Sequence, residues 1–278
     1  MEYLDRDSAP LTESEWNKID AAVVASARTS LIGRRILNLE GPLGAGTYSL
    51  PYSVYSAKPE VAIDMNGEGE NNIIEAASRK LASLPLIYAD FKLSWRDIET
   101  DRKSGLALDV SASAIAAGAV AAQEDDLIFN GNKALGLEGL MNVSGRNTIK
   151  LTKWEDVGAG LADVVRAVNT LATAAHFGPY ALVTSPSLYG KLVRVYASTG
   201  LLELEQIKTI VTGGVYYSNA LQGDKAILLE TGAQNSSLAI GQDFTTGYLG
   251  AEKMNHLFRV LETITLLVRR PQAICTLE

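Results

Sequence analysis

The fold of this chain is decided by a stretch that opens with Tyr48-Ser49-Leu50-Pro51-Tyr52-Ser53-Val54-Tyr55 and runs on to Asn66-Gly67-Glu68-Gly69-Glu70. In its first part large apolar residues are interspersed with small polar ones, which is typical of β-strands. Asn-Gly is a strong signal for a hairpin turn, and the glutamates keep the tip polar. Residues 47–78 therefore predict a long β-hairpin with little core of its own. Such an arm is marginal alone and needs partners on its faces or edges.

A helix is predicted before this hairpin. Thr12-Glu13-Ser14-Glu15 fits a capping box, in which a hydroxyl and a carboxylate satisfy free amides at a helix start. The residues that then share one face at helical spacing are Trp16, Ile19, Val23, Ala27 and Leu31. The pattern by itself favours a helix packed on the core.

A second, alanine-rich helix is predicted after the hairpin, over residues 112–129, with Gly131 as its stop. Its small side chains would let another element approach closely. The acidic run Glu124, Asp125 and Asp126 lies late in this helix. Because consecutive helical residues point in different directions, we expect these acids on a solvated face or in salt bridges between subunits.

The remaining chain mixes strands and helices and has no internal repeat. A strand is predicted over residues 91–95, a helix over 154–177, a buried strand over 180–184, a helix from Ser185-Pro186, and a helix that holds Leu204, Ile207 and Val211. The tail is predicted to be β-rich, with strands over 226–229, 238–240 and 257–269. The apolar parity of the last strand is interrupted by Glu262. The sum is an α+β fold with two lobes.

The composition narrows the class of protein. Hydrophobic residues make up 47% and charged residues 21% of the chain, so most of it is expected to be folded. A net charge of -7 without clustered Lys and Arg argues against a nucleic-acid partner. The single cysteine, Cys275, cannot form an intrachain disulfide, which fits a reducing compartment. With no signal-peptide pattern and no membrane-span pattern, we expect a cytoplasmic protein without a membrane partner.

No combination of residues predicts a catalytic, metal or cofactor site. The two histidines, His176 and His256, lack ligand neighbours at metal-binding spacing, and His176 is interpreted as a polar cap at a helix end. The Gly-rich stretch 41–46 lacks the Lys of a phosphate loop and reads as a turn. No Gly-x-Ser-x-Gly elbow occurs, and Cys275 is expected to be a buried, inert thiol.

Short motifs along nearly the whole chain carry a resemblance to a known family. They are Ala9-Pro10-Leu11-Thr12, Gly33-Arg34-Arg35, Glu40-Gly41-Pro42, Glu124-Asp125, Ile128-Phe129, Gly139-Leu140, Gly178-Pro179-Tyr180, Gly241-Gln242-Asp243, Gly247-Tyr248, Phe258-Arg259-Val260 and Glu262-Thr263. In this order and spacing the chain resembles family 1 encapsulins, shell proteins with the HK97-type major-capsid fold of tailed phages. Stretches such as Tyr88-Ala89-Asp90-Phe91 and Met254-Asn255-His256 look closest to encapsulins that enclose ferritin-like, iron-storing cargo.

The resemblance implies a division of the chain into four parts. Residues 1–46 would be an N-terminal helix and arm, 47–78 the extended E-loop, 79–140 with 230–278 the peripheral domain, and 141–229 the axial domain. The hairpin would pair with a neighbouring subunit, and the alanine-rich helix would be the spine of the peripheral domain.

The resemblance also implies partners and sites. The chain is expected to form an icosahedral homo-oligomer of a multiple of sixty copies. It is expected to enclose a cargo enzyme, ferritin-like or a peroxidase, through a C-terminal targeting peptide that docks in an apolar cleft. By position, the cleft residues would be Ala27, Leu31, Arg34, Leu37, Asn38 and Ile240, with Arg34 orienting the peptide. The pore residues would be Ser198, Thr199, Gly200 and Leu201. Some relatives carry an aromatic residue at position 27 and an acid at 38, so the preferred peptide is expected to differ here.

Two alternatives stay open at this point. One is a phage or prophage major capsid protein that packages DNA and has the same fold. The other is a stand-alone enzyme, for which the sequence offers no nucleophile with a base.

Overall fold

The computed structural model describes all residues except 1, 56–60, 69–72, 105–106 and 197–199. Its elements are η1 Glu2–Leu4, η2 Arg6–Ser8, α1 Glu13–Ser30, α2 Gly33–Ile36, β1 Asn38–Glu40, β2 Ser49–Val54, β3 Ser78–Ser83, β4 Leu86–Leu93, α3 Trp95–Ser104, α4 Ser111–Asn130, η3 Lys133–Leu135, β5 Asn147–Ile149, α5 Ala159–Thr173, β6 Tyr180–Thr184, α6 Pro186–Leu192, α7 Glu203–Ile210, β7 Val215–Tyr217, β8 Ala226–Glu230, β9 Ser236–Glu252, β10 Asn255–Val268, η4 Pro271–Ala273 and β11 Ile274–Leu277.

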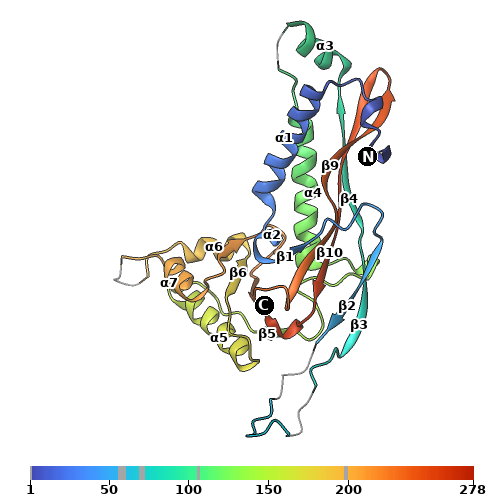
Figure 1. The fold of residues 1–278 in the computed structure, drawn as a ribbon. Helices are drawn as coiled ribbons and strands as arrows, with labels where there is room; N and C mark the ends of the chain where they lie inside the picture. Colours follow the sequence, from blue (N-terminus) through green and yellow to red (C-terminus); the bar gives the residue numbers. More distant parts are fainter. Residues whose placement is uncertain (1, 56–60, 69–72, 105–106, 197–199) are drawn as a thin grey trace.

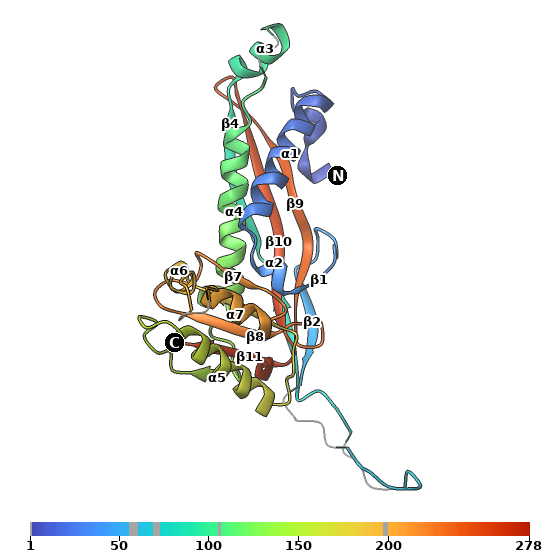
Figure 2. The same ribbon diagram turned by 90° about the vertical axis from the view of Figure 1, so that its left-hand side faces the viewer.

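The long axis of the molecule is built from a four-stranded sheet in the order β1-β9-β10-β4. Helices α1 and α4 lie side by side along this sheet (Figures 1 and 2). The core between the layers is aromatic where Phe258 of β10 meets Trp16 of α1 edge-on and Phe91 of β4 in a stack, with ring centroids 5.6 and 5.3 Å apart. Burial of these large side chains is the main stabilising term of this layer.

Local sequence signals explain both long helices. The predicted capping box is present at α1: the Glu15 amide donates to Thr12 Oγ1, and the Thr12 amide donates to Glu15 Oε2 at 2.6 Å. The alanine-rich α4 begins at Ser111 and ends at Gly131, whose φ of 69° is costly for any residue with a side chain. Its small residues allow α1 close enough for Ser26 Oγ to donate to the Ala114 carbonyl at 2.6 Å.

A second lobe surrounds a five-stranded sheet in the order β5-β11-β8-β6-β7, with α5, α6 and α7 packed around it. Its core is a separate apolar cluster that includes Trp154, Leu171, Leu188 and Ile207. Strand β11 pairs with β5 and β8 here. The segment 230–278 therefore contributes to both sheets, since β9 and β10 belong to the first and β11 to the second.

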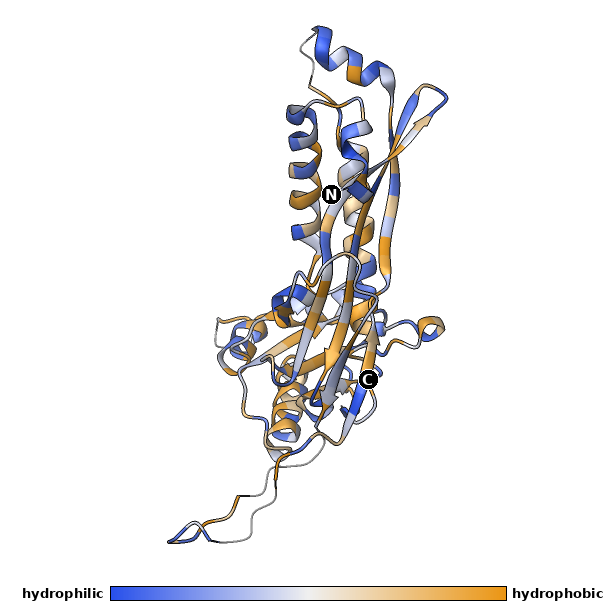
Figure 3. Ribbon diagram, turned by 45° about the vertical axis from the view of Figure 1, so that its right-hand side comes forward, coloured by the Kyte–Doolittle hydropathy of each residue, from blue (hydrophilic) through white to orange (hydrophobic). Residues whose placement is uncertain are grey.

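Strands β2 and β3 pair antiparallel from Ser49↔Ser83 to Val54↔Ser78 and form the base of a projecting arm. In the arm, the Asp64 carboxylate accepts backbone hydrogens near the predicted turn, including that of Asn66 at 2.8 Å, and Gly67 has a φ of 71°. The described apolar residues beyond the ladder are Val61, Ile63, Met65, Ile73 and Ile74, which are 69–98% exposed. Figure 3 shows hydrophobic residues in this projection as well as in the body.

Three local predictions were wrong. The strand predicted to reach Trp95 ends at Leu93, because Trp95 begins the charged helix α3, in which only Ile98 is buried. The helix predicted over 154–177 is shorter and spans Ala159–Thr173. Strand β9 is much longer than the predicted 238–240. Its polar residues and glycines give no strand pattern in the sequence, and its pairing with β10 stabilises the extended conformation.

Candidate functional site

The predicted cleft residues come together where α1 ends and β1 runs beside β9. Ala27 and Leu31, both buried at the end of α1, form a small apolar cluster with Ala121 of α4 and the partly buried Phe244 of β9. The C-terminal end of α1 therefore lies directly against α4 and β9.

The other apolar members belong to the main core. Leu37 precedes β1, and Ile240 lies in β9; both are buried. The Leu43 amide donates to the Ile240 carbonyl at 2.8 Å, which ties the turn after β1 to β9. Asn38 is exposed in β1, beside Leu39, which is 47% exposed. Among the six predicted residues, Asn38 alone is exposed, Arg34 is partly buried and the other four are buried.

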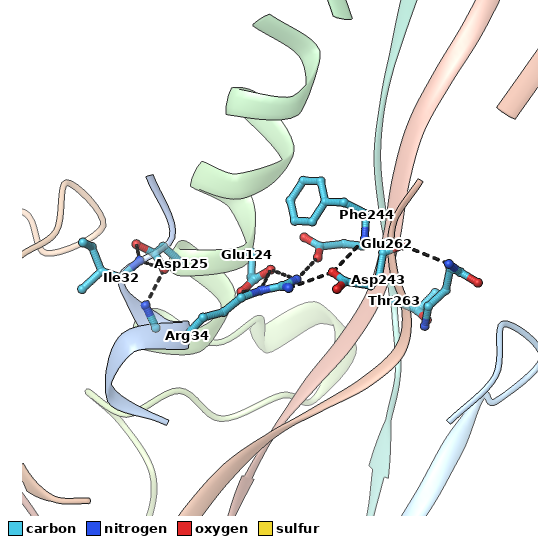
Figure 4. A network of polar contacts seen from close by, with 10 residues as sticks. Ile32, Arg34, Glu124, Asp125, Asp243, Phe244, Glu262 and Thr263 are labelled. Carbon is cyan, nitrogen blue, oxygen red and sulfur yellow. Dashed lines mark hydrogen bonds and ion pairs between the residues drawn. The ribbon is translucent and has the colours of Figure 1, made fainter. Parts of the chain in front are cut away.

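Arg34 of α2 lies at the centre of this region in a network of carboxylates (Figure 4). Its Nε donates to Glu124 Oε1 at 2.9 Å, and Nη2 donates to Glu124 Oε2 at 2.8 Å. Nη2 also donates to Glu262 Oε2 at 2.7 Å, while Nη1 donates to Asp243 Oδ1 at 2.7 Å. The guanidinium thereby joins α2 to α4, β9 and β10. Its role in orienting a peptide stays a prediction.

Burial decides the electrostatics of this network. The side chains of Glu124 and Glu262 are 0% exposed, Arg34 is 14% exposed and Asp243 is 58% exposed. Burial raises the pKa of Glu262 well above its usual value, the adjoining Glu124 raises it further, and Arg34 opposes both. Burial disfavours charged Arg34, but hydrogen bonds and attraction from Glu124, Glu262 and Asp243 raise its pKa overall.

The neighbouring acid Asp125 holds the start of α2. Its carboxylate accepts hydrogen bonds from the Gly33 amide at 2.9 Å, from the Ile32 amide at 3.1 Å and from Ser218 Oγ at 3.2 Å. Burial raises the pKa of Asp125 to about 6, against the lowering effect of these amides. An added Cβ at Gly33 would lie 2.4 Å from the end of the Ile128 side chain, which would have to shift.

The prediction for the acidic run was therefore wrong for two of its three residues. Glu124 and Asp125 are buried and paired within the chain, whereas Asp126 accepts from Asn130 at 2.8 Å. Phe244 and Asp243 also belong to this region, although no sequence pattern predicted either of them. The one signal that could have revealed the network is Glu262, which interrupts the apolar parity of β10.

The predicted pore residues are only partly described. Ser198 and Thr199 lie outside the described residues. Gly200 has a φ of 75°, and Leu201 is 52% exposed in the turn before α7, where its carbonyl accepts the Tyr196 amide at 2.7 Å. Their role at a pore stays a prediction.

His176 and Glu230 form a buried pair in the second lobe. His176 Nδ1 lies 2.6 Å from Glu230 Oε2, and Glu230 also accepts the Phe177 and Gly178 amides at 2.9 Å. Burial raises the pKa of the Cys275 thiol to about 11. Within the described part of the chain, no group of three or more His, Cys, Asp and Glu residues is arranged to hold a metal ion. No described helix has the length and apolarity needed to cross a membrane.

A recess of about 560 Å³ lies beside the turn between α1 and α2. It is bounded by Thr29, Arg35, Asp126, Tyr189 and Tyr217, among others. The rings of Tyr189 and Tyr217 are 5.0 Å apart. None of the six predicted cleft residues lines this recess.

Solved structures with the same fold are shells. A virus-like particle from Pyrococcus furiosus superposes with a TM-score of 0.77 at 21% identity, covering 96% of this chain and 100% of that one. The capsid of Myoviridae phage XM1 superposes with a TM-score of 0.65 at 10% identity, covering 88% and 90%. The chain therefore has the HK97-type major-capsid fold, as its sequence predicts.

Sequence comparison identifies the family. Residues 1–265 match the family described as "Encapsulating protein for peroxidase". The type 1 encapsulin shell protein EncA of Myxococcus xanthus is 46% identical over 277 residues, 100% of this chain and 96% of the relative. A diheme-cytochrome-encapsulin shell fusion protein of Kuenenia stuttgartiensis is 44% identical, covering 96% and 74%. A ferritin-like-encapsulin shell fusion protein of Pyrococcus furiosus is 28% identical, covering 57% and 46%. The chain belongs to the encapsulin shell-protein family.

Proposed function

We propose that this chain is the shell subunit of a closed icosahedral compartment in the cytoplasm, built from a multiple of sixty copies. The observation that carries the proposal is the arm. Its described apolar residues Val61, Ile63 and Ile73 are 78–96% exposed in the single chain. Several large apolar side chains exposed on one projecting hairpin favour an interaction site, and a hairpin supported at its base alone needs a partner.

We propose domain roles that follow from this assembly. The hairpin around residues 47–78 serves as the E-loop that covers a neighbouring subunit. The lobe around the first sheet serves as the peripheral domain, and residues 141–229 serve as the axial domain near symmetry axes. Gly200 and Leu201, with Ser198 and Thr199, would then border a pore.

We propose that the region around Ala27, Leu31, Arg34, Leu37, Asn38 and Ile240 receives a C-terminal targeting peptide of the cargo. Support comes from the small cluster of Ala27, Leu31 and Phe244 beside the exposed Leu39. Apolar anchors of an extended tail can pack on such a surface. Arg34 would contribute by holding α2 in place, because its donors already meet three carboxylates.

The proposed cargo is a ferritin-like protein, with a peroxidase as the other candidate. The fusion relative named above joins a ferritin-like part to a shell, and the family description names peroxidase. In this proposal the shell contributes no catalysis and no cofactor of its own.

Electron microscopy of particles purified from the native host tests the assembly and the cargo together. Closed shells with internal protein density are expected, and a compact monomer in every buffer would rule out the container. A low ratio of ultraviolet absorbance at 260 to 280 nm is also expected, since these shells would enclose protein. Particles filled with DNA would favour a phage capsid instead.

The cleft is tested by Leu39→Asp, which alters a side chain already 47% exposed and therefore should not unfold the subunit. Intact shells with less co-purified cargo are expected. Val165→Asp is the control, because Val165 of α5 has a similar exposure of 37% in the other lobe. Equal cargo in both variants would contradict the cleft.

A further inference from the structure

The network around Arg34 contains more acid than base. Three carboxylates, from Glu124, Asp243 and Glu262, contact a single guanidinium. Two of the three are fully buried. If both buried acids were ionised, two negative charges would face one guanidinium in a place that water does not reach, which is strongly unfavourable.

The contacts of the Glu262 side chain indicate that this acid is the one that takes up a proton. Its Oε2 accepts from Arg34, but its buried Oε1 has no hydrogen-bond partner among the residues described. A buried orphan oxygen is rare and costly. A proton on Oε1 converts this oxygen into a donor and leaves Arg34 with one ionised buried carboxylate, Glu124, and with the exposed Asp243.

Among the residues that the structure describes, no second cation is paired with Glu124 or Glu262. The α2 helix contributes Arg34, β9 contributes Asp243, and α4 contributes Glu124, followed by Asp125, which caps α2. Strand β4 places Ile87 opposite Glu262, and the nearest acid on that strand, Asp90, pairs with Arg259 at 2.6 Å.

We propose that Glu262 carries a proton in the native shell at neutral pH and is the positioning residue that holds Arg34 against Glu124. Alkaline deprotonation then loosens α2 and the adjoining segment of β9. Arg34 also lies over the Phe244 ring, with its guanidinium carbon 5.3 Å from the ring centroid. A displacement of Arg34 would therefore also loosen the packing of the Phe244 ring. The protonation of Glu262 does not depend on the proposed function. Only the assignment of Phe244 to a cargo cleft rests on it.

The sign of the pH effect follows from linkage. The raised pKa of Glu262 means that the native protein binds its proton more tightly than the opened protein does. Above the ordinary glutamate pKa, native stability at this site falls as pH rises, and it levels off once the native proton is lost. The slope for one proton is a factor of about ten per pH unit in the opening equilibrium.

Amide hydrogen exchange on assembled wild-type and Glu262→Gln shells tests the proposal between about pH 6 and pH 9. In wild type, the protection factors of the amides near Leu37 and Phe244 should fall by about tenfold per pH unit until they level off. In Glu262→Gln, which mimics the neutral acid, they should stay constant. Asp90→Asn is the control, since it alters an exposed acid on the paired strand and should keep the wild-type profile.

Two outcomes overturn the proposal. One is a pH profile of Glu262→Gln equal to that of wild type. The other is lower protection of Glu262→Gln already at neutral pH, which would show that the charge is needed. If Glu262→Gln does not assemble, the infrared spectrum of wild-type shells decides. A carboxylic-acid carbonyl band that disappears in alkaline solution is expected, and its absence at neutral pH overturns the proposal. Failure of the cargo cleft would instead appear as normal loading of Leu39→Asp shells, with the exchange result unchanged.

Discussion

In most proteins large apolar side chains are buried and charged ones are exposed. The projecting arm and the Arg34 network depart from this distribution in opposite directions. The arm exposes large apolar side chains, of which Ile63 is 96% exposed. The network buries charged ones, and the side chains of Glu124 and Glu262 are 0% exposed. Each arrangement is unfavourable unless a partner covers or neutralises it.

The difference lies in where that partner comes from. The network finds its partner within the chain, because Arg34 reaches three other elements. The described part of the arm has no such cover in a single copy, so we infer that another copy provides it. We therefore expect the network to limit the stability of the subunit and the arm to limit its assembly.

The largest loss of subunit stability is expected for Arg34→Met. This change removes the one cation that, in the described part of the chain, contacts the buried carboxylates Glu124 and Glu262. Breaking a buried ion pair in this way costs about 3–5 kcal/mol. Chemical denaturation at fixed protein concentration measures it. Arg35→Met is the matched control, because Arg35 is exposed and has no ion pair in the described structure, and it should change stability by less than about 0.5 kcal/mol. Equal losses in both variants would mean that the network does not limit stability.

A smaller loss is expected for Asp125→Ala, which leaves the amides of Ile32 and Gly33 without their acceptor. The cost of unsatisfied buried donors is about 1–3 kcal/mol. Asp125→Asn, which keeps an acceptor oxygen, separates this effect from charge. Because the pKa of Asp125 is raised to about 6, ionisation destabilises the native state. Wild type should therefore lose stability relative to Asp125→Asn as pH rises from about 4 to 6. A flat difference over this range would refute the role of charge.

A loss of about 1–2 kcal/mol at neutral pH is expected for Glu230→Gln, because the carboxylate accepts from His176 and two amides. Burial raises the pKa of Glu230, but the hydrogen bonds from His176, Asn235 and Gly178 lower it overall. Its contribution is therefore present above the ordinary glutamate pKa and is lost as pH falls below it. Thermal unfolding of wild type and variant should converge in acid. Curves that stay parallel down to acid pH would contradict this.

The smallest change in subunit stability is expected in the arm. Ile63→Asp with Ile73→Asp alters side chains that are 96% and 87% exposed, so subunit unfolding should change by less than about 0.5 kcal/mol. Assembly should nevertheless fail, because charges would enter an apolar contact between copies. Light scattering and electron microscopy measure this. Normal particles from the double variant would mean that the arm is dispensable.

Much of the fold could be predicted because its signals are local. The capping box at Thr12, the stop at Gly131 and the strand Tyr180–Thr184 each depend on neighbouring residues, and the structure has all three. Strand β9 and helix α3 were missed for the converse reason. The residues of both elements show weak hydrophobic periodicity. Long-range pairing makes β9 a strand, and α3 is a helix with a mostly charged surface.

The site was harder to predict, since its chemistry depends on contacts between distant residues. From the sequence, Arg34 was predicted to orient a peptide, and Glu124 was predicted to lie on a solvated face or in a salt bridge between subunits. Residues 34, 124, 243 and 262 meet only when α2, α4, β9 and β10 pack together.

The sequence by itself determined the family, the fold class and the projecting hairpin, because these depend on motif order, hydrophobic periodicity and turn residues along the chain. Only the tertiary structure decided which acids are buried, which of them share Arg34, and which sheet receives the last strand. Burial and distance set the energy of a charge, and neither exists until the elements have packed.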